Sequence, residues 1–170
     1  MKNFISLLSL VLVFLGFSSA SFAQSTATSA STTADATIVA PITISAGSDL
    51  AFGSVVKSAA GGTVTLATDG SRTASGVSFS PTSTGSPTAS SFTVGGEAGY
   101  AYAVSFPSAT VTLTKTNSTE TMTVGTFTSN STNSLTGGTQ TLLVGATLNV
   151  GAAQVAGAYV GTYTVKVDYN

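Results

Sequence analysis

The sequence predicts an all-β fold, a β-sandwich of about nine short, mainly antiparallel strands. Apolar and polar residues alternate in short runs, and no stretch after residue 23 shows the period of a helix. Thr and Val favour strands, and clusters rich in Gly separate the runs as turns do. The absence of a fixed-period repeat argues against a β-helix or a propeller.

The N-terminus reads as an export signal. Lys2 precedes an apolar run from Phe4 to Phe17, and small residues follow up to Ala23. We expect cleavage between Ala23 and Gln24. A membrane anchor is the weaker alternative, because the run is shorter than the roughly 20 apolar residues that span a bilayer. The mature protein is then expected in the periplasm, on the outer cell surface or outside the cell.

After cleavage, residues 24–33 are expected to form a flexible polar leader and residues 34–170 a single sandwich domain. Its strands are expected at 34–45, 49–56, 63–67, 72–80, 90–94, 100–106, 111–114, 121–127, 141–150 and 157–170. Pro41 marks the first strand as an edge strand or a bulged one. Gly95 to Gly99 are expected to join their two neighbouring strands as a hairpin.

The last strand carries the clearest alternation. From Gly157 to Asn170 every second residue is placed on a buried face, namely Tyr159, Gly161, Tyr163, Val165, Val167 and Tyr169. A long strand must pair, because its free N–H and C=O groups otherwise recruit another chain. The partner is either a strand of the same domain or a strand of another copy.

Composition argues against an enzyme. The chain has no His and no Cys, which excludes Ser-His-Asp and Cys-His sites and any metal site with those ligands. The carboxylates Asp49, Asp69, Glu97 and Glu120 are scattered over predicted turns, so a paired-acid site is not expected. A Ser-Lys pair and a calcium site built from loop carbonyls are weaker alternatives. We expect no catalytic residue, no cofactor and no metal.

The charge and the aromatic content of the chain indicate which classes of partner it is not expected to bind. The part after residue 23 has four basic and six acidic residues, a net charge of −2, so nucleic acid is not expected to bind. No second apolar run is long enough to span a membrane. A glycan-binding module would need exposed aromatic rings, whereas Phe52, Phe79, Phe106 and Tyr163 are expected in the core.

Several motifs occur in a recognisable order. They are Leu50-x-Phe52-Gly53, Gly62-Thr63-Val64-Thr65-Leu66, Phe92-Thr93-Val94-x-Gly96, Tyr102-x-Val104-x-Phe106-Pro107, Leu143 to Leu148, Gln154, and the alternating residues 157–170. Together they resemble the secreted bacterial family known as domain of unknown function 4402. The layout of that family is similar to the spore coat protein U family, which includes subunits of archaic chaperone–usher pili.

The resemblance implies an immunoglobulin-like sandwich exported by a Gram-negative bacterium. In pilins of that type a groove beside the C-terminal strand accepts an N-terminal extension of the next subunit. It implies a non-enzymatic structural or adhesion-type protein, like a fimbrial subunit, whose partners are copies of itself, related subunits, and a periplasmic chaperone and usher. The alternative is a monomeric module that binds a glycan or a protein. The candidate pairing face is Tyr159, Tyr163, Val165, Val167, Tyr169, Ile38, Ile42 and Ile44.

Overall fold

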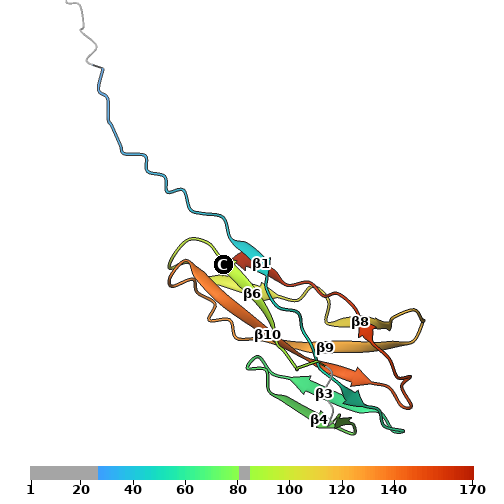
Figure 1. Ribbon diagram of the computed structural model, residues 1–170. Helices are drawn as coiled ribbons and strands as arrows, with labels where there is room; N and C mark the ends of the chain where they lie inside the picture. Colours follow the sequence, from blue (N-terminus) through green and yellow to red (C-terminus); the bar gives the residue numbers. More distant parts are fainter. Residues whose placement is uncertain (1–26, 81–84) are drawn as a thin grey trace, which may run out of the picture. The chain divides into compact units, whose positions relative to one another are not determined.

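The computed structural model describes residues 27–80 and 85–170, and β-strands are the only regular secondary structure in this part of the chain (Figure 1). The strands are β1 (Thr43–Ala46), β2 (Val55–Val56), β3 (Gly62–Leu66), β4 (Arg72–Ser75), β5 (Ser78–Phe79), β6 (Ser90–Gly95), β7 (Tyr102–Ser105), β8 (Thr110–Lys115), β9 (Thr121–Ser129), β10 (Thr139–Val150), β11 (Tyr159–Val160) and β12 (Lys166–Tyr169). All their pairings are antiparallel. The predicted all-β class is therefore confirmed.

The chain divides into two units, Met1–Thr37 and Ile38–Asn170. In the first unit, residues 27–37 are exposed and form no strand. The predicted signal cleavage at Ala23 and Gln24 lies outside the described residues. The second unit contains all twelve strands of the described part.

Strand β10 organises the largest sheet, whose order is β1-β6-β10-β9-β8-β11, with β3 also on β10 and β4 on β3. Along one edge, β10 pairs with β6 from Thr139 to Val144 and with β3 from Ala146 to Val150. Gly145 lies where the partner changes. A Cβ at this position would overlap the carbonyl oxygen of Leu66, so the close approach of the β3 backbone requires glycine here.

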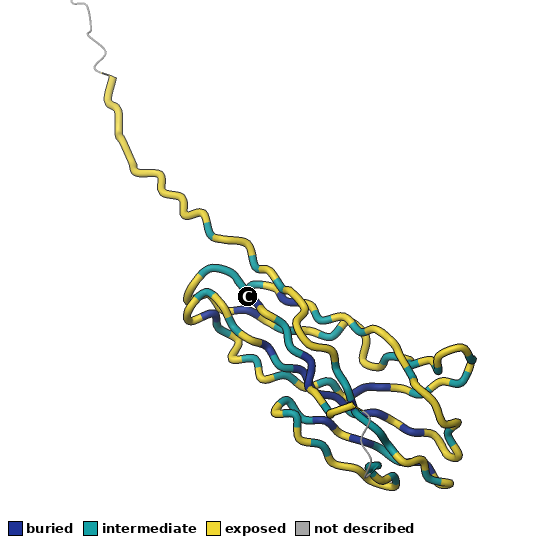
Figure 2. The backbone as a smooth tube through the Cα atoms, in the orientation of Figure 1, coloured by how far each residue is buried: buried dark blue, intermediate teal, exposed yellow. Residues whose placement is uncertain are grey.

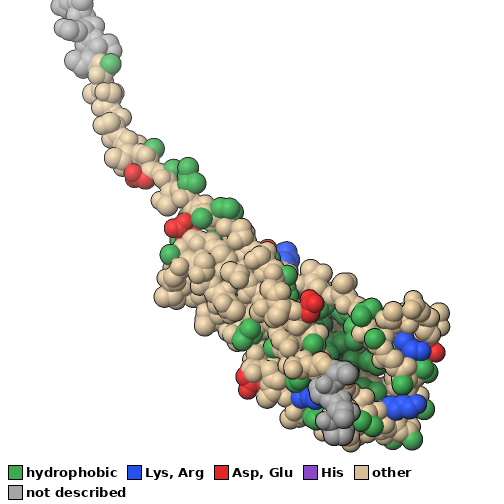
Figure 3. Space-filling view, viewed as in Figure 1, with side chains coloured by type: hydrophobic (Ala, Val, Ile, Leu, Met, Phe, Trp, Pro, Cys, Tyr) green, Lys and Arg blue, Asp and Glu red, His purple; other side chains and the backbone are tan. Residues whose placement is uncertain are grey.

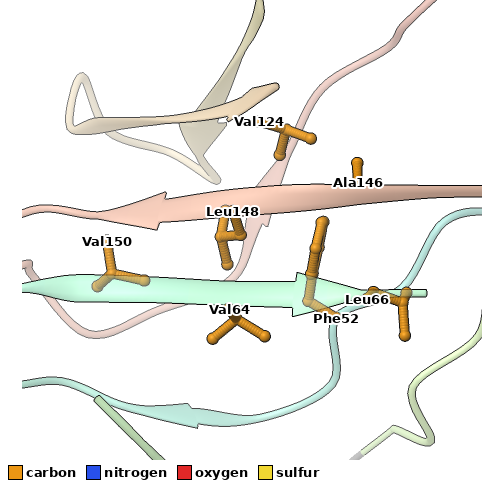
Figure 4. Packing of buried hydrophobic residues seen from close by; sticks show 7 residues of the cluster. All are labelled: Phe52, Val64, Leu66, Val124, Ala146, Leu148 and Val150. Atoms are coloured by element: carbon orange, nitrogen blue, oxygen red, sulfur yellow. The ribbon is translucent and has the colours of Figure 1, made fainter. Parts of the chain in front are cut away.

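Two small sheets cover the inner face of the large sheet. The β2–β5 pair packs over one cluster, the β3 core, which comprises Phe52, Val64, Leu66, Val124, Ala146, Leu148 and Val150 (Figure 4). The β7–β12 pair contributes to a second cluster, the β6 core, which comprises Val94, Tyr102, Leu135, Leu142, Val144 and Val167. Two layers of antiparallel strands around apolar clusters make a sandwich.

The outer face of the large sheet is polar but uncharged. Buried and exposed residues alternate along its strands (Figure 2). The register places outward residues beside one another, as in Thr65 with Thr147, whose hydroxyls lie 3.0 Å apart. Most outward positions are Thr, Ser or Asn, among them Thr63, Thr93, Thr112, Thr123, Thr141 and Asn149. Thr suits this position because it combines strand propensity with a polar group.

Five predicted elements differ from the structure. The predicted strand 49–56 is a strand only at Val55–Val56. The predicted strand 72–80 is two short strands, β4 on β3 and β5 on β2. The residues at Gly95–Gly99 do not close a hairpin, because β6 pairs with β1 and β10 whereas β7 pairs with β12. The predicted strand 34–45 is a strand only from Thr43, since the segment before it has no ladder partner. The predicted strand 157–170 is two short strands, β11 on β8 and β12 on β7, so it changes sheet between them.

Candidate assembly face

Six of the eight residues predicted for the pairing face lie together. Val167 belongs to the β6 core, and five others pack against it, namely Ile42, Ile44, Tyr163, Val165 and Tyr169. Residues 161–165 keep the side-chain alternation although they form no ladder, because alternation follows from extended backbone itself. This group of six residues is called the assembly face below.

Tyr159 and Ile38 lie apart from the assembly face. The Tyr159 hydroxyl donates to the Val155 carbonyl at 2.8 Å and accepts from the Gln154 side chain at 2.8 Å, which fixes the loop before β11. Ile38 is 97% exposed, so its apolar side chain has almost no contact with its own domain. A fully exposed isoleucine is the kind of residue that a partner buries.

Strand β12 has one unpaired edge. The N–H of Asn170 donates to the Ala101 carbonyl, which continues the β12–β7 ladder by one hydrogen-bonded pair. Hydrogen-bonded and non-hydrogen-bonded pairs alternate in an antiparallel ladder. The backbone groups of Val167 and Tyr169 therefore point away from β7, and they have no backbone partner among the described residues.

Strand β1 has an unpaired edge for the same reason. The N–H of Gly47 donates to the Ser91 carbonyl, so the backbone groups of Ile44 and Ala46 point away from β6. Strands β1 and β12 approach each other in space. The assembly face thus combines two free strand edges with apolar side chains from both strands.

Three hydrogen bonds among Ala40, Glu97 and Tyr169 form a closed set, called the clasp below. The clasp links the segment just before β1 to the end of β12. The Ala40 N–H donates to a Glu97 carboxylate oxygen at 2.9 Å, and the Tyr169 hydroxyl donates to the Ala40 carbonyl at 2.9 Å. The Glu97 N–H donates to the Tyr169 hydroxyl at 2.6 Å, which closes the set. A Cβ on Gly96 would overlap that hydroxyl, so glycine makes room for it.

Sequence reasoning treated Glu97 as part of a turn and missed the clasp. The one local signal is the pair Gly95-Gly96 directly before an acidic residue, which indicates a close approach of another group. The identity of the approaching group is not readable from that pair, because Tyr169 is 72 residues away in the chain.

Four aromatic rings form a row beside the assembly face. Phe127 stacks on Phe106 with centroids 5.2 Å apart and on Tyr163 at 5.1 Å, and Phe92 meets Tyr163 edge to face. All four are partly buried. Burial raises the pKa of the Tyr163 hydroxyl, against the opposing effect of its hydrogen bond with Ser90.

The carboxylates occupy separate local structures. Asp69 accepts hydrogen bonds from the hydroxyl and the N–H of Ser71, which lower its pKa. The Ser118 hydroxyl likewise donates to Glu120 and lowers its pKa. Asp69 and Glu120 thus each stabilise the turn in which they lie. Within the described residues, no three potential metal-binding side chains come together.

The described ranges also contain no helix that is long and apolar enough to cross a membrane. Fold and face together define the chain as an antiparallel two-layer β domain with two free strand edges. The family model for a domain of unknown function, DUF4402, matches residues 42–169, and the chain belongs to that family. Comparison with curated proteins gave no match. Comparison with solved structures gave none either.

Proposed function

We propose that this chain is an exported, non-enzymatic structural or adhesion-type protein, like a fimbrial subunit, that assembles by β-strand addition between copies. The observation that carries the proposal is the pair of free edges on β1 and β12 with apolar residues between them. A strand that pairs with such an edge gains main-chain hydrogen bonds, and its alternate side chains gain apolar contacts. The export signal expected in residues 1–23 supports a surface or periplasmic location.

Incomplete coverage of the β3 core supports the same proposal. The residues packed against this core are only partly buried, among them Leu50, Val77, Leu113 and Met122. Hydrophobic side chains gather in a hollow over β9 and β10 (Figure 3). A complete second layer would cover such residues, so an added strand has apolar surface to bury.

The donor in this proposal is the segment around Ile38 of a second copy. Its apolar residues Ala36 and Ile38 alternate with polar ones and lie before Ala40, the residue that the clasp holds, and alternation is the pattern that an added strand needs. Residues 27–37 are exposed and unpaired in strands, so this part of the chain has no ladder to leave before it binds. A head-to-tail contact of this kind extends into an open fibre.

The test compares the mature chain, residues 24–170, with a variant that lacks residues 24–39 and so keeps Ala40 and the clasp. Light scattering and electron microscopy should show concentration-dependent oligomers for the mature chain and a folded monomer for the shortened one. A labelled peptide of residues 34–45 should bind the shortened variant. Ile38→Asp should abolish assembly, whereas Thr37→Asp, its exposed neighbour, should not. A mature chain that stays monomeric at millimolar concentration contradicts the proposal.

A further inference from the structure

A second surface feature lies at the beginning of β8. It is a hollow of about 480 Å³ lined by Phe106, Phe127, Thr110, Thr126, Asn149 and two small residues. This volume lies within the range of small-molecule sites in proteins, and the hollow is open to solvent rather than enclosed. The lining combines two aromatic rings with three uncharged polar side chains and contains no charged residue.

A strained β-bulge forms one wall of the hollow. Gly145 pairs with Thr128 and Thr147 pairs with Gly125, so Thr126 and Phe127 both lie opposite Ala146. Thr126 has φ of 48°, a left-handed conformation that a β-branched residue rarely adopts. The extra residue directs Phe127 inward, between Phe106 and Tyr163. Bulges and strained residues are frequent at functional sites.

The polar groups of the hollow have unused hydrogen-bonding capacity. The hydroxyls of Thr110 and Thr126 are on exposed residues and bond to no described protein group. Asn149 donates one long hydrogen bond, 3.5 Å, to Thr123, and its amide oxygen accepts none from the described residues. A ligand could therefore bond to two hydroxyls and an amide without displacing a protein partner.

The aromatic part of the lining is asymmetric. Phe127 has rings stacked on both faces, from Phe106 and Tyr163. Phe106 contacts only Phe127 among the described rings, so one of its faces has no aromatic partner. Phe106 packs against the β6 core and also lines the hollow, so the part of it that faces the hollow can pack against an apolar surface of a ligand.

We propose that this hollow binds one ring of a neutral saccharide. The C–H face of a sugar ring packs on the part of Phe106 that lines the hollow, and its hydroxyls bond to Thr110, Thr126 and the Asn149 amide. Acidic sugars, phosphates and carboxylates are disfavoured because the lining has no cation to pair with them. The lining residues are not members of the assembly face, although Phe127 stacks on Tyr163 of that face, so sugar binding and assembly are measured separately.

The experiment is a screen of the mature chain, residues 24–170, against an array of neutral and acidic glycans. The best neutral glycan is then titrated by calorimetry. Phe106→Ala and Asn149→Ala should each weaken binding roughly tenfold or more. Tyr100→Ala is the matched control, because Tyr100 is an aromatic residue that is 42% exposed and lies outside the hollow. It should bind as the unchanged protein does.

Circular dichroism identifies any variant that does not fold. If Phe106→Ala fails this check, Asn149→Ala still tests the site, since Asn149 is exposed. Three results would overturn the proposal: no neutral glycan binds at millimolar concentration, acidic glycans bind in preference, or folded Asn149→Ala binds with unchanged affinity. The oligomeric state of the same samples, measured by light scattering, tests β-strand addition separately from sugar binding.

Discussion

The phenol hydroxyl of Tyr169 donates to the backbone carbonyl of Ala40 at 2.9 Å, across 129 residues of sequence. The same hydroxyl accepts the Glu97 N–H, so one side chain bonds to two distant segments. The clasp thereby holds together the segment before β1, the loop after β6 and the end of β12.

Tyr169→Phe should lower the free energy of unfolding by about 1–2 kcal/mol, because it leaves a backbone carbonyl and an N–H without their partner. Urea denaturation monitored by circular dichroism measures the change. Tyr100→Phe is the control, since the Tyr100 ring packs on Tyr169 but its hydroxyl has no described partner. Equal stability of the two variants would show that the two Tyr169 hydrogen bonds of the clasp contribute nothing.

Gly145→Ala should destabilise the domain by roughly 2–3 kcal/mol, because the new Cβ meets the β3 backbone at Leu66 rather than a flexible side chain. Gly137→Ala, where a Cβ has no neighbour within 4 Å, should be close to neutral. The midpoints of thermal unfolding of the two variants measure this difference in stability. A tolerated Gly145→Ala would mean that β10 and β3 separate more easily than their close approach indicates.

Thr126→Gly should stabilise the domain by about 0.5–1 kcal/mol. A left-handed conformation costs an L-residue about 1–2 kcal/mol, and the entropy of glycine in the unfolded chain offsets part of the gain. Thr112→Gly, at a regular exposed position of β8, should instead destabilise. The comparison is made by chemical denaturation, and a loss of stability in Thr126→Gly would mean that the Thr126 side chain itself stabilises the bulge.

Stability should fall at alkaline pH because of Tyr163. Its pKa is raised by burial, so the folded state keeps the proton after the unfolded chain has lost it. The contribution is fully present below the unfolded value of about 10, and it is lost as pH rises through the folded pKa. Urea midpoints measured between neutral and alkaline pH should fall less steeply in Tyr163→Phe. An unchanged slope would assign the alkaline loss to other groups.

Alternation was enough to predict the all-β class and the approximate positions of most strands. Val64 and Leu66 on β3, or Leu142 and Val144 on β10, are buried as their spacing indicates. Alternation reports only that the backbone is extended and one face is buried, however, and it does not report the ladder partner. That is why the last fourteen residues were predicted as one strand although they contact two sheets.

Long-range contacts account for the remaining errors. Gly95 to Gly99 permit a turn, but the pairing of β7 with β12 is decided by Tyr102 and Val167 in a shared core. Phe106 and Tyr163 were predicted as core residues and do pack against the β6 core, but the position of Phe127 between their rings was not predicted. The bulge that turns Phe127 depends on a register shift against β10, which has no local sequence signal.

The clasp has a mechanical consequence. Ala40 lies just before β1 and Tyr169 is the last residue of β12, so a pulling force applied to the chain on either side of the domain reaches these two residues first. The load then falls on the phenol hydrogen bonds before it reaches the β1–β6 and β12–β7 ladders. Under tension the domain would yield by opening at the clasp, and the sheets behind it would keep their register.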